Sequence, residues 1–188
     1  MVTGASSPTF VQAQRFIGDR VTAALERVDP AKIARAVEIL SKAPQSFVYG
    51  AGRSGIVGRA FAMRLVQIGL RAFVIGESVT PIVQHGDAVF ILSGQGESSS
   101  SIQTANIVRR EGAELIVLTG QATSKLAHTA SLLLALDLPD EPERARLAPL
   151  GTLFESASLR LTDALVAELA VSRGESEASM RRRHAIIV

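Results

Sequence analysis

The chain contains no cysteine and no tryptophan, and only 4% of its 188 residues are aromatic. The absence of cysteine excludes disulfides, thiolate metal sites and a cysteine nucleophile, and it fits a reducing compartment. Hydrophobic residues still make up 47% of the chain, so alanine, valine, leucine and isoleucine must fill the core. This composition favours helices packed on a parallel sheet over an aromatic-rich binding surface.

The chain also has no large excess of charge of one sign and no long apolar run. The formal net charge is +2, and the one dense basic run, Arg181 to Arg183, has no interleaved aromatic residues, which argues against nucleic-acid binding. The longest apolar stretch, Leu132 to Leu136, is too short to span a bilayer, and residues 1–10 show no secretory signal pattern. We therefore expect a soluble cytoplasmic protein without nucleic-acid or membrane partners.

Short apolar strands alternate with helical segments after two leading helices, Pro8–Val28 and Pro30 to about Lys42. The predicted strands are Ser46–Tyr49, Arg71–Ile75, Asp87–Leu92, Glu114–Leu118 and Leu132–Leu136, and the later helices are Ser54–Ile68, Ser98–Glu111, Ser124–Ala130 and Pro149–Val171. This alternation predicts an α/β fold, a doubly wound five-stranded parallel sheet with helices on both faces. We expect one domain over residues 1–188, with a helical lead-in (1–44) and a C-terminal tail (174–188).

A glycine loop follows the first predicted strand. Its sequence, Gly50-Ala51-Gly52-Arg53-Ser54-Gly55, matches the dinucleotide-binding fingerprint, and Glu77 follows the second strand, where an acidic residue could hold a ribose. Arg53 and Ser54 favour a terminal phosphate instead, because they add a cation and a hydroxyl at a helix N-terminus that already attracts anions. The loop alone leaves both ligands open.

A serine-rich loop follows the third predicted strand. Five of the nine residues from Ser93 to Ser101 are serine, and two glycines among them let the backbone approach a ligand closely. A flexible linker or a helix cap is the simpler interpretation, since serine is a common N-cap. So many hydroxyls directly after a buried strand exceed what capping needs, and we expect the loop to bind an anion.

The segment Leu147 to Glu155 opens the last long helix and places a carboxylate beside an apolar stripe. The stripe consists of Leu150, Phe154, Ala157, Leu161, Leu165 and Leu169. Glu155 is therefore either an acid–base group next to an apolar surface or a solvated glutamate of the first helical turn, which the helix dipole favours. The pattern alone leaves both interpretations open.

Together these segments resemble the SIS (sugar isomerase) domain family, and within it most closely the 6-phospho-3-hexuloisomerases. The similar segments are Gly50–Gly55, Phe61–Leu65, Gly76–Pro81, the serine-rich loop, Leu147–Glu155 and Asp163–Leu169. They span nearly the whole chain. The glycine loop by itself is weakly specific, whereas the ordered set is strongly specific, above all Leu-Ala-Pro-Leu-Gly-Thr-Leu-Phe-Glu.

The resemblance implies interconversion of D-arabino-hex-3-ulose 6-phosphate and fructose 6-phosphate through an enediol, without a metal or a nucleotide cofactor. This is the second step of formaldehyde fixation by the ribulose monophosphate route. By motif position, Glu155 would be the base. The residues expected to hold the phosphate are Ser54, Ser93 and Ser98, with Gln95 where the family usually has serine, and Arg53 as a cation. Those expected to orient loops or sugar hydroxyls are Gly52, Glu77 and Glu97.

The C-terminal Arg183-His184-Ala185 matches the start of the family's Arg-His-Ala-Asn-Leu tail. In the family this histidine is expected to enter an active site in the oligomer, which makes His184 a second catalytic candidate. Here residues 186–188 depart from the family tail, so a disordered terminal histidine is the alternative. We expect a homo-oligomer, a tetramer, with shared active sites. An isomerase of another sugar phosphate and a non-catalytic sugar-phosphate-binding protein remain alternatives.

Overall fold

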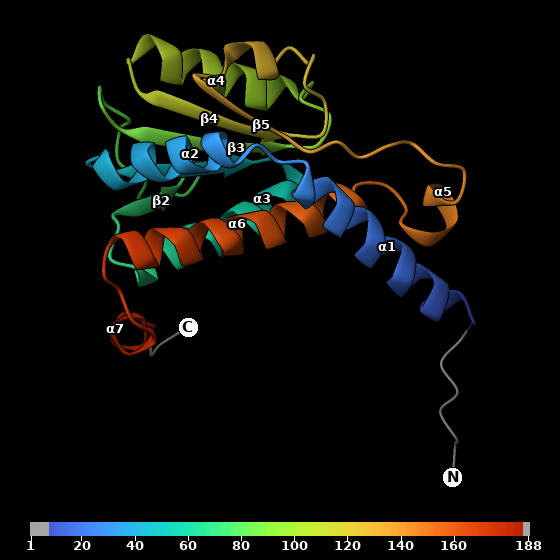
Figure 1. The fold of residues 1–188 in the computed structure, drawn as a ribbon. Helices are drawn as coiled ribbons and strands as arrows, with labels where there is room; N and C mark the ends of the chain where they lie inside the picture. The colour runs from blue at the N-terminus through green and yellow to red at the C-terminus, as the bar shows by residue number, and fades with distance from the viewer. Residues whose placement is uncertain (1–7, 186–188) are drawn as a thin grey trace.

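In the computed structural model, which describes residues 8–185, five parallel strands form a central sheet (Figure 1). The strands are β1 (Ser46–Gly50), β2 (Ala72–Val74), β3 (Ala88–Ser93), β4 (Glu114–Thr119) and β5 (Leu132–Ala135). They lie in the order β2-β1-β3-β4-β5, and each neighbouring pair is parallel. The predicted five-stranded parallel sheet is confirmed.

Two helices precede the sheet in the described chain, α1 (Pro8–Glu26) and α2 (Pro30–Lys42). They separate at Asp29, whose carboxylate accepts the N–H of Ala31 at 2.8 Å, while Pro30 occupies the first turn of α2. Aspartate as N-cap and proline at the first helical position are the residues that favour a helix start. The predicted lead-in of two helices is therefore confirmed.

Further helices follow the strands. They are α3 (Gly52–Gln67), α4 (Ser99–Arg110), the 3₁₀ turn η1 (Ala127–Thr129), α5 (Arg144–Leu147), α6 (Thr152–Ser172) and α7 (Glu177–Arg182). The helix expected over residues 124–130 is only the short turn η1. Neither α5 nor α7 was predicted, because a helix of one or two turns is too short to show an apolar periodicity.

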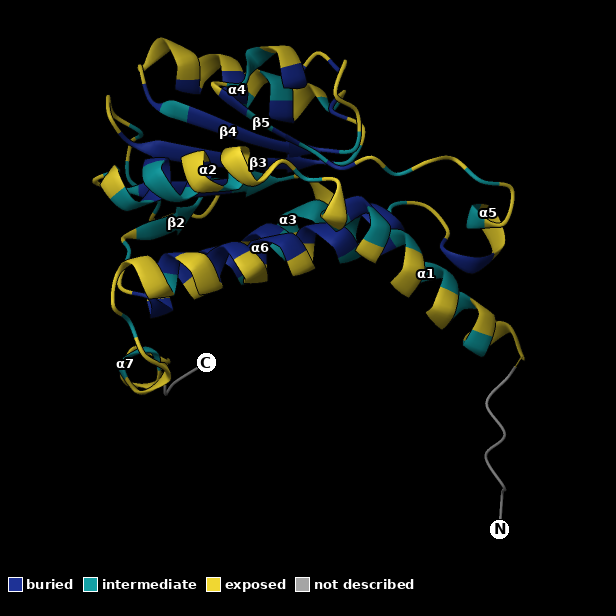
Figure 2. Ribbon diagram, in the orientation of Figure 1, coloured by how far each residue is buried: buried dark blue, intermediate teal, exposed yellow. Residues whose placement is uncertain are grey.

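The helices cover both faces of the sheet, as Figure 1 shows, with α4 on one side and α2, α3 and α6 on the other. Successive strand residues point to opposite faces. Val48, Phe90 and Leu118 therefore join the larger core with the helices of the second side, while Phe47 and Val117 join a smaller core with α4. Figure 2 shows the central strands β3 and β4 as mostly buried, whereas the edge strand β2 is of intermediate burial.

The amino end of the sheet is fixed by a buried carboxylate. Asp87, which is 1% exposed, accepts the backbone N–H of Gln45 at 3.2 Å and that of Gln84 at 2.8 Å. These bonds tie the entries of β1 and β3 together. The loops that carry polar residues follow the opposite, carboxyl ends of the strands.

None of the helices between residues 8 and 185 has the length and apolar character needed to cross a membrane.

Candidate active site

A cleft of about 410 Å³ opens at the carboxyl ends of β1 and β3. At this point the strand order reverses, since β2 lies on one side of β1 and β3 on the other. Open parallel sheets bind their ligands at such a switch point. The polar residues that line the cleft are Ser54, Ser93, Gln95, Glu97, Ser98 and Glu155. The structure thus brings together side chains from three distant loops.

The glycine loop makes a turn that only glycine permits. A Cβ added to Gly55 would lie 2.4 Å from the carbonyl oxygen of Gly50, and one added to Gly50 would lie 2.8 Å from the backbone nitrogen of Gly55. The end of β1 and the start of α3 are therefore in direct backbone contact. Gly52, with φ of 57°, makes the turn between them. This packing sets Ser54 at the edge of the cleft.

The serine-rich loop arches from β3 to the N-terminus of α4. The buried Ser93 hydroxyl accepts the N–H of Gly96 at 3.2 Å. Ser98 stands at the N-cap position of α4, yet within the described chain its side chain caps no helical N–H and instead contacts the Ser100 hydroxyl at 3.0 Å. The first N–H groups of a helix favour an anion. The Ser98 hydroxyl is thus available beside a helix N-terminus in the cleft.

The start of α6 brings a carboxylate to the same cleft. The ring of Phe154 lies against Gly94 and Gly120, where an added Cβ would meet ring carbons at 3.2 Å and 3.7 Å respectively. This contact fixes the first turn of α6 and with it the adjacent Glu155, whose side chain is only 11% exposed. Its Oε2 accepts the Nε–H of Arg53 at 2.6 Å. Arg53 is 69% exposed, so the carboxylate is held and the cation is open to solvent.

Two other predicted acidic residues have different surroundings. Glu97 lines the cleft, but its carboxylate accepts the backbone N–H of Lys125 and also pairs with the Lys125 ammonium, and these contacts lower the pKa of Glu97. Glu77 pairs with Arg59 at 2.7 Å and lines a hollow beside α3 and β2. The structure does not bring Glu77 to the cleft. Among the described residues, no three acidic or histidine side chains gather where they could hold a metal ion.

His184 is also remote from the cleft of its own chain. It is exposed, and its Nδ1 lies 2.9 Å from the carbonyl oxygen of Ala185. The preceding Arg183 contacts Glu175 and the Gln67 carbonyl oxygen, beyond the C-terminal end of α6. Because α6 ends at Ser172 and rises 1.5 Å per residue, about 26 Å separates that end from Glu155 (Figure 1). The departure from the family tail at residues 186–188 lies outside the described residues.

A second hollow, of about 630 Å³, adjoins the cleft and shares four of its lining residues: Gly94, Gln95, Gly151 and Phe154. Its further polar lining comes from Gln121, Asp140 and Arg144. Asp140 and Arg144 were not predicted as site residues, because the segment 138–146 resembles a charged connection, and Gln121 belongs to none of the motifs. Only the path of this segment in space, beside Leu150 and the cleft, shows its place in the site.

Residues 39–170 match the SIS domain family. An uncharacterized protein of Archaeoglobus fulgidus is 35% identical over 164 residues, 85% of this chain and 90% of that protein. A 3-hexulose-6-phosphate isomerase of Methylomonas aminofaciens is 31% identical over 174 residues, 92% of this chain and 96% of that enzyme. The crystal structure of a hypothetical protein, 30% identical, superposes with a TM-score of 0.92 over 96% of this chain and 98% of its own. The chain therefore belongs to the SIS domain family, as its motifs predicted.

Proposed function

We propose that this protein is a sugar-phosphate isomerase that interconverts D-arabino-hex-3-ulose 6-phosphate and fructose 6-phosphate. The observation that carries the proposal is the position of the Glu155 carboxylate in the same cleft as Ser54, Ser93 and Ser98. A phosphate anchor and a base that line one cleft are what proton transfer on a sugar phosphate needs. The name of the Methylomonas aminofaciens relative supports this choice of substrate.

The phosphate binds in the serine-lined part of the cleft. The Ser54 and Ser98 hydroxyls donate to its oxygens, the Ser93 hydroxyl keeps its own proton for donation while it accepts from Gly96, and the N-terminus of α4 stabilises the negative charge. Gln95 lies in the same wall and donates through its amide. Binding the remote phosphate orients the reacting carbons against the base.

Glu155 moves the carbon-bound proton. It removes the proton from C2 of the hex-3-ulose, and the electrons of that C–H bond form the double bond of a 2,3-enediol as the C3 carbonyl oxygen takes up a proton. The O2 proton then leaves, the carbonyl re-forms at C2, and Glu155 returns its proton to C3, which yields fructose 6-phosphate. Arg53, 2.6 Å from this carboxylate, turns toward the phosphate or the carbonyl oxygen when the substrate binds. A placed acid–base group contributes about 10²–10⁴-fold to the rate.

The protons on oxygen need a second group, and His184 of another subunit is our candidate. Its own cleft is beyond its reach, because the tail lies at the far end of α6. A histidine can exchange protons near neutral pH. This assignment requires a homo-oligomer, a tetramer in our proposal, in which each tail enters a neighbouring cleft.

The test is a conversion assay with fructose 6-phosphate and the purified protein. Carbon-13 NMR should show the 3-ketose growing to a constant ratio with fructose 6-phosphate, without added nucleotide. A chain truncated after Met180 should keep its far-UV circular dichroism and lose most of the rate. Binding of fructose 6-phosphate without any conversion would refute the isomerase assignment. An unchanged rate in the truncated chain would remove His184 from it.

A further inference from the structure

The second hollow has the chemistry of a subsite for a neutral, hydroxyl-rich group. We call it the distal hollow and define it by Gln95, Gln121, Asp140, Arg144 and Leu150. The Arg144 guanidinium donates from Nε to Asp140 at 2.7 Å and from its NH1 nitrogen to the Leu150 carbonyl oxygen at 3.1 Å. The two opposite charges balance, so the hollow does not select an anion. The two glutamine amides offer both donors and acceptors, as sugar hydroxyls require.

The Glu155 carboxylate lies at the junction of this hollow with the phosphate cleft. Gly151 lines both spaces, and a Cβ added to Gly151 would lie 2.8 Å from Oε1 of Glu155. A ligand that extends from the serine-rich loop into the distal hollow along Gly151 would therefore lie beside this carboxylate. In a hexulose 6-phosphate the reacting carbons C2 and C3 lie between the phosphate and C1, so such a ligand would present them to Glu155.

The outer wall of the distal hollow is held in place by α1. Arg20 forms two hydrogen bonds with the Glu141 carboxylate, at 2.5 and 2.6 Å, and both side chains are partly buried. Arg27 pairs with Asp137 at 3.0 Å and also donates to its carbonyl oxygen. A two-bond contact between arginine and a carboxylate fixes geometry as well as distance. The hollow is thus a preformed space and not a gap beside a loose loop.

We propose that the distal hollow binds the phosphate-free end of the sugar, C1 with its hydroxyl, and that Gln121 and Arg144 determine how long a sugar phosphate the site accepts. This inference rests on the proposed function, because it assumes that the serine-lined cleft holds the phosphate. Two of the five N–H donors of Arg144 are engaged in the contacts described above, and the others can serve the ligand. Gln121 is exposed at the mouth, so its amide can meet the terminal hydroxyl.

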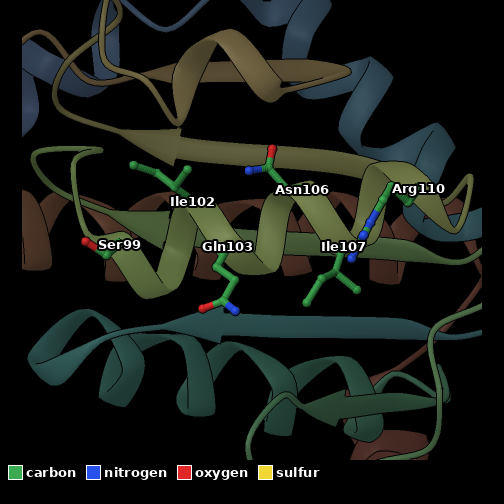
Figure 3. A pocket seen from close by; sticks show the side chains of 6 residues that line it. All are labelled: Ser99, Ile102, Gln103, Asn106, Ile107 and Arg110. Carbon is green, nitrogen blue, oxygen red and sulfur yellow. The ribbon is translucent and has the colours of Figure 1, made fainter.

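The test compares three ligands of increasing length: inorganic phosphate, glycerol 3-phosphate and fructose 6-phosphate. Dissociation constants are measured by calorimetry for the native chain, Gln121→Ala and Arg144→Ala. The matched control is Gln103→Ala, an exposed glutamine on the outer side of α4 (Figure 3) that lines neither the cleft nor the distal hollow. Because Arg144 also supports the loop, Gln121→Ala is the variant that leaves the wall contacts intact.

We expect Gln121→Ala and Arg144→Ala to weaken the binding of fructose 6-phosphate about five- to tenfold, the effect of one or two lost hydrogen bonds. The dissociation constant of inorganic phosphate should stay unchanged in both variants, and Gln103→Ala should change the dissociation constant of neither ligand. Equal affinity of the native chain and both variants for fructose 6-phosphate would overturn the proposal, as would a native chain that binds this sugar no more tightly than inorganic phosphate.

The same data separate this proposal from the proposed function. Ser98→Ala, in the phosphate cleft, should weaken the binding of all three ligands. If Gln121→Ala and Arg144→Ala weaken the binding of fructose 6-phosphate alone, but the native chain converts no sugar, the subsite stands and the isomerase assignment fails. If the native chain isomerises fructose 6-phosphate, and Gln121→Ala and Arg144→Ala keep the native affinity for this sugar and the native rate of conversion, the isomerase assignment stands and the subsite is wrong.

Discussion

Exchanging one hydrogen for a methyl group at Gly55 should damage both the fold and the phosphate cleft. The new Cβ would lie 2.4 Å from the Gly50 carbonyl oxygen. The obstacle is backbone, which cannot rotate away as a side chain can. The same change at Gly18, a helical glycine in α1 with nothing within 4 Å of the added Cβ, is a matched control.

The size of the effect at Gly55 follows from the contact. Carbon–oxygen contacts normally lie at about 3.3–3.6 Å, so the end of β1 and the start of α3 must separate by about 1 Å. Overpacking of this kind costs about 1–3 kcal/mol, and a backbone contact belongs at the upper end. Alanine gains about 1 kcal/mol over glycine within a helix. We therefore expect Gly55→Ala to lose about 2 kcal/mol of unfolding free energy and Gly18→Ala to gain about 0.5–1 kcal/mol.

Urea denaturation followed by far-UV circular dichroism measures both changes, since the chain has no tryptophan for a fluorescence readout. The neighbouring Ser54 should move with the turn, and an error of about 1 Å in a site can cost 10²-fold in rate. Gly55→Ala should accordingly lower kcat/KM by at least tenfold, and Gly18→Ala should not. A Gly55→Ala protein as stable as Gly18→Ala would refute the direct contact between strand and helix.

Three further predictions concern the sheet, the phosphate loop and the tail. Asp87→Ala leaves two part-buried backbone N–H groups, those of Gln45 and Gln84, without their acceptor, at about 1–2 kcal/mol each. Urea denaturation should therefore show a loss of about 2–4 kcal/mol; a loss under about 1 kcal/mol would contradict this role. Ser93→Ala and Ser98→Ala should each weaken fructose 6-phosphate about fivefold by calorimetry, one hydrogen bond apiece, and unchanged affinity would exclude them from the phosphate site. The pKa of Glu175 is lowered from 4.5 to about 2, chiefly by the hydrogen bonds from Arg183. Because the folded-state pKa is the lower one, this contact stabilises the docked tail above about pH 4.5 and is lost as the pH falls toward 2. Amide exchange of residues 177–182, corrected for its intrinsic rate, should lose protection over that range, and Glu175→Gln should lack the protection already at pH 7.

The sheet could be predicted because its strands are short apolar runs bounded by polar or glycine residues. β3 is buried along its whole length, and a short apolar run that ends in serine and glycine is typical of a strand that leads into a loop. The short helices α5 and α7 could not be predicted. Their positions depend on contacts with distant residues, such as Arg183 against the α3–β2 turn at Gly69, which no local pattern contains.

The candidate site was predictable where it depends on topology alone. Ser54 comes shortly after β1 and Ser93 ends β3, so both lie at the carboxyl ends of parallel strands and meet at the switch point whatever the details of packing. Glu77 follows β2, the edge strand, and its pairing with Arg59 turns it away. Arg144 belongs to a connection with no motif, and only the three-dimensional path beside Leu150 brings it to the distal hollow.

The most direct test of the account is deuterium exchange into fructose 6-phosphate in D₂O, catalysed by the native chain and by Glu155→Gln. The amide replaces the carboxylate with nearly the same volume and leaves the serine-rich loop unchanged. We expect deuterium at the carbon next to the carbonyl, C3, with the native chain, and a rate of exchange at least about 10²-fold lower with the variant, while both proteins bind the sugar phosphate. Exchange by Glu155→Gln at the native rate, or none by a native chain that binds the ligand, would contradict it.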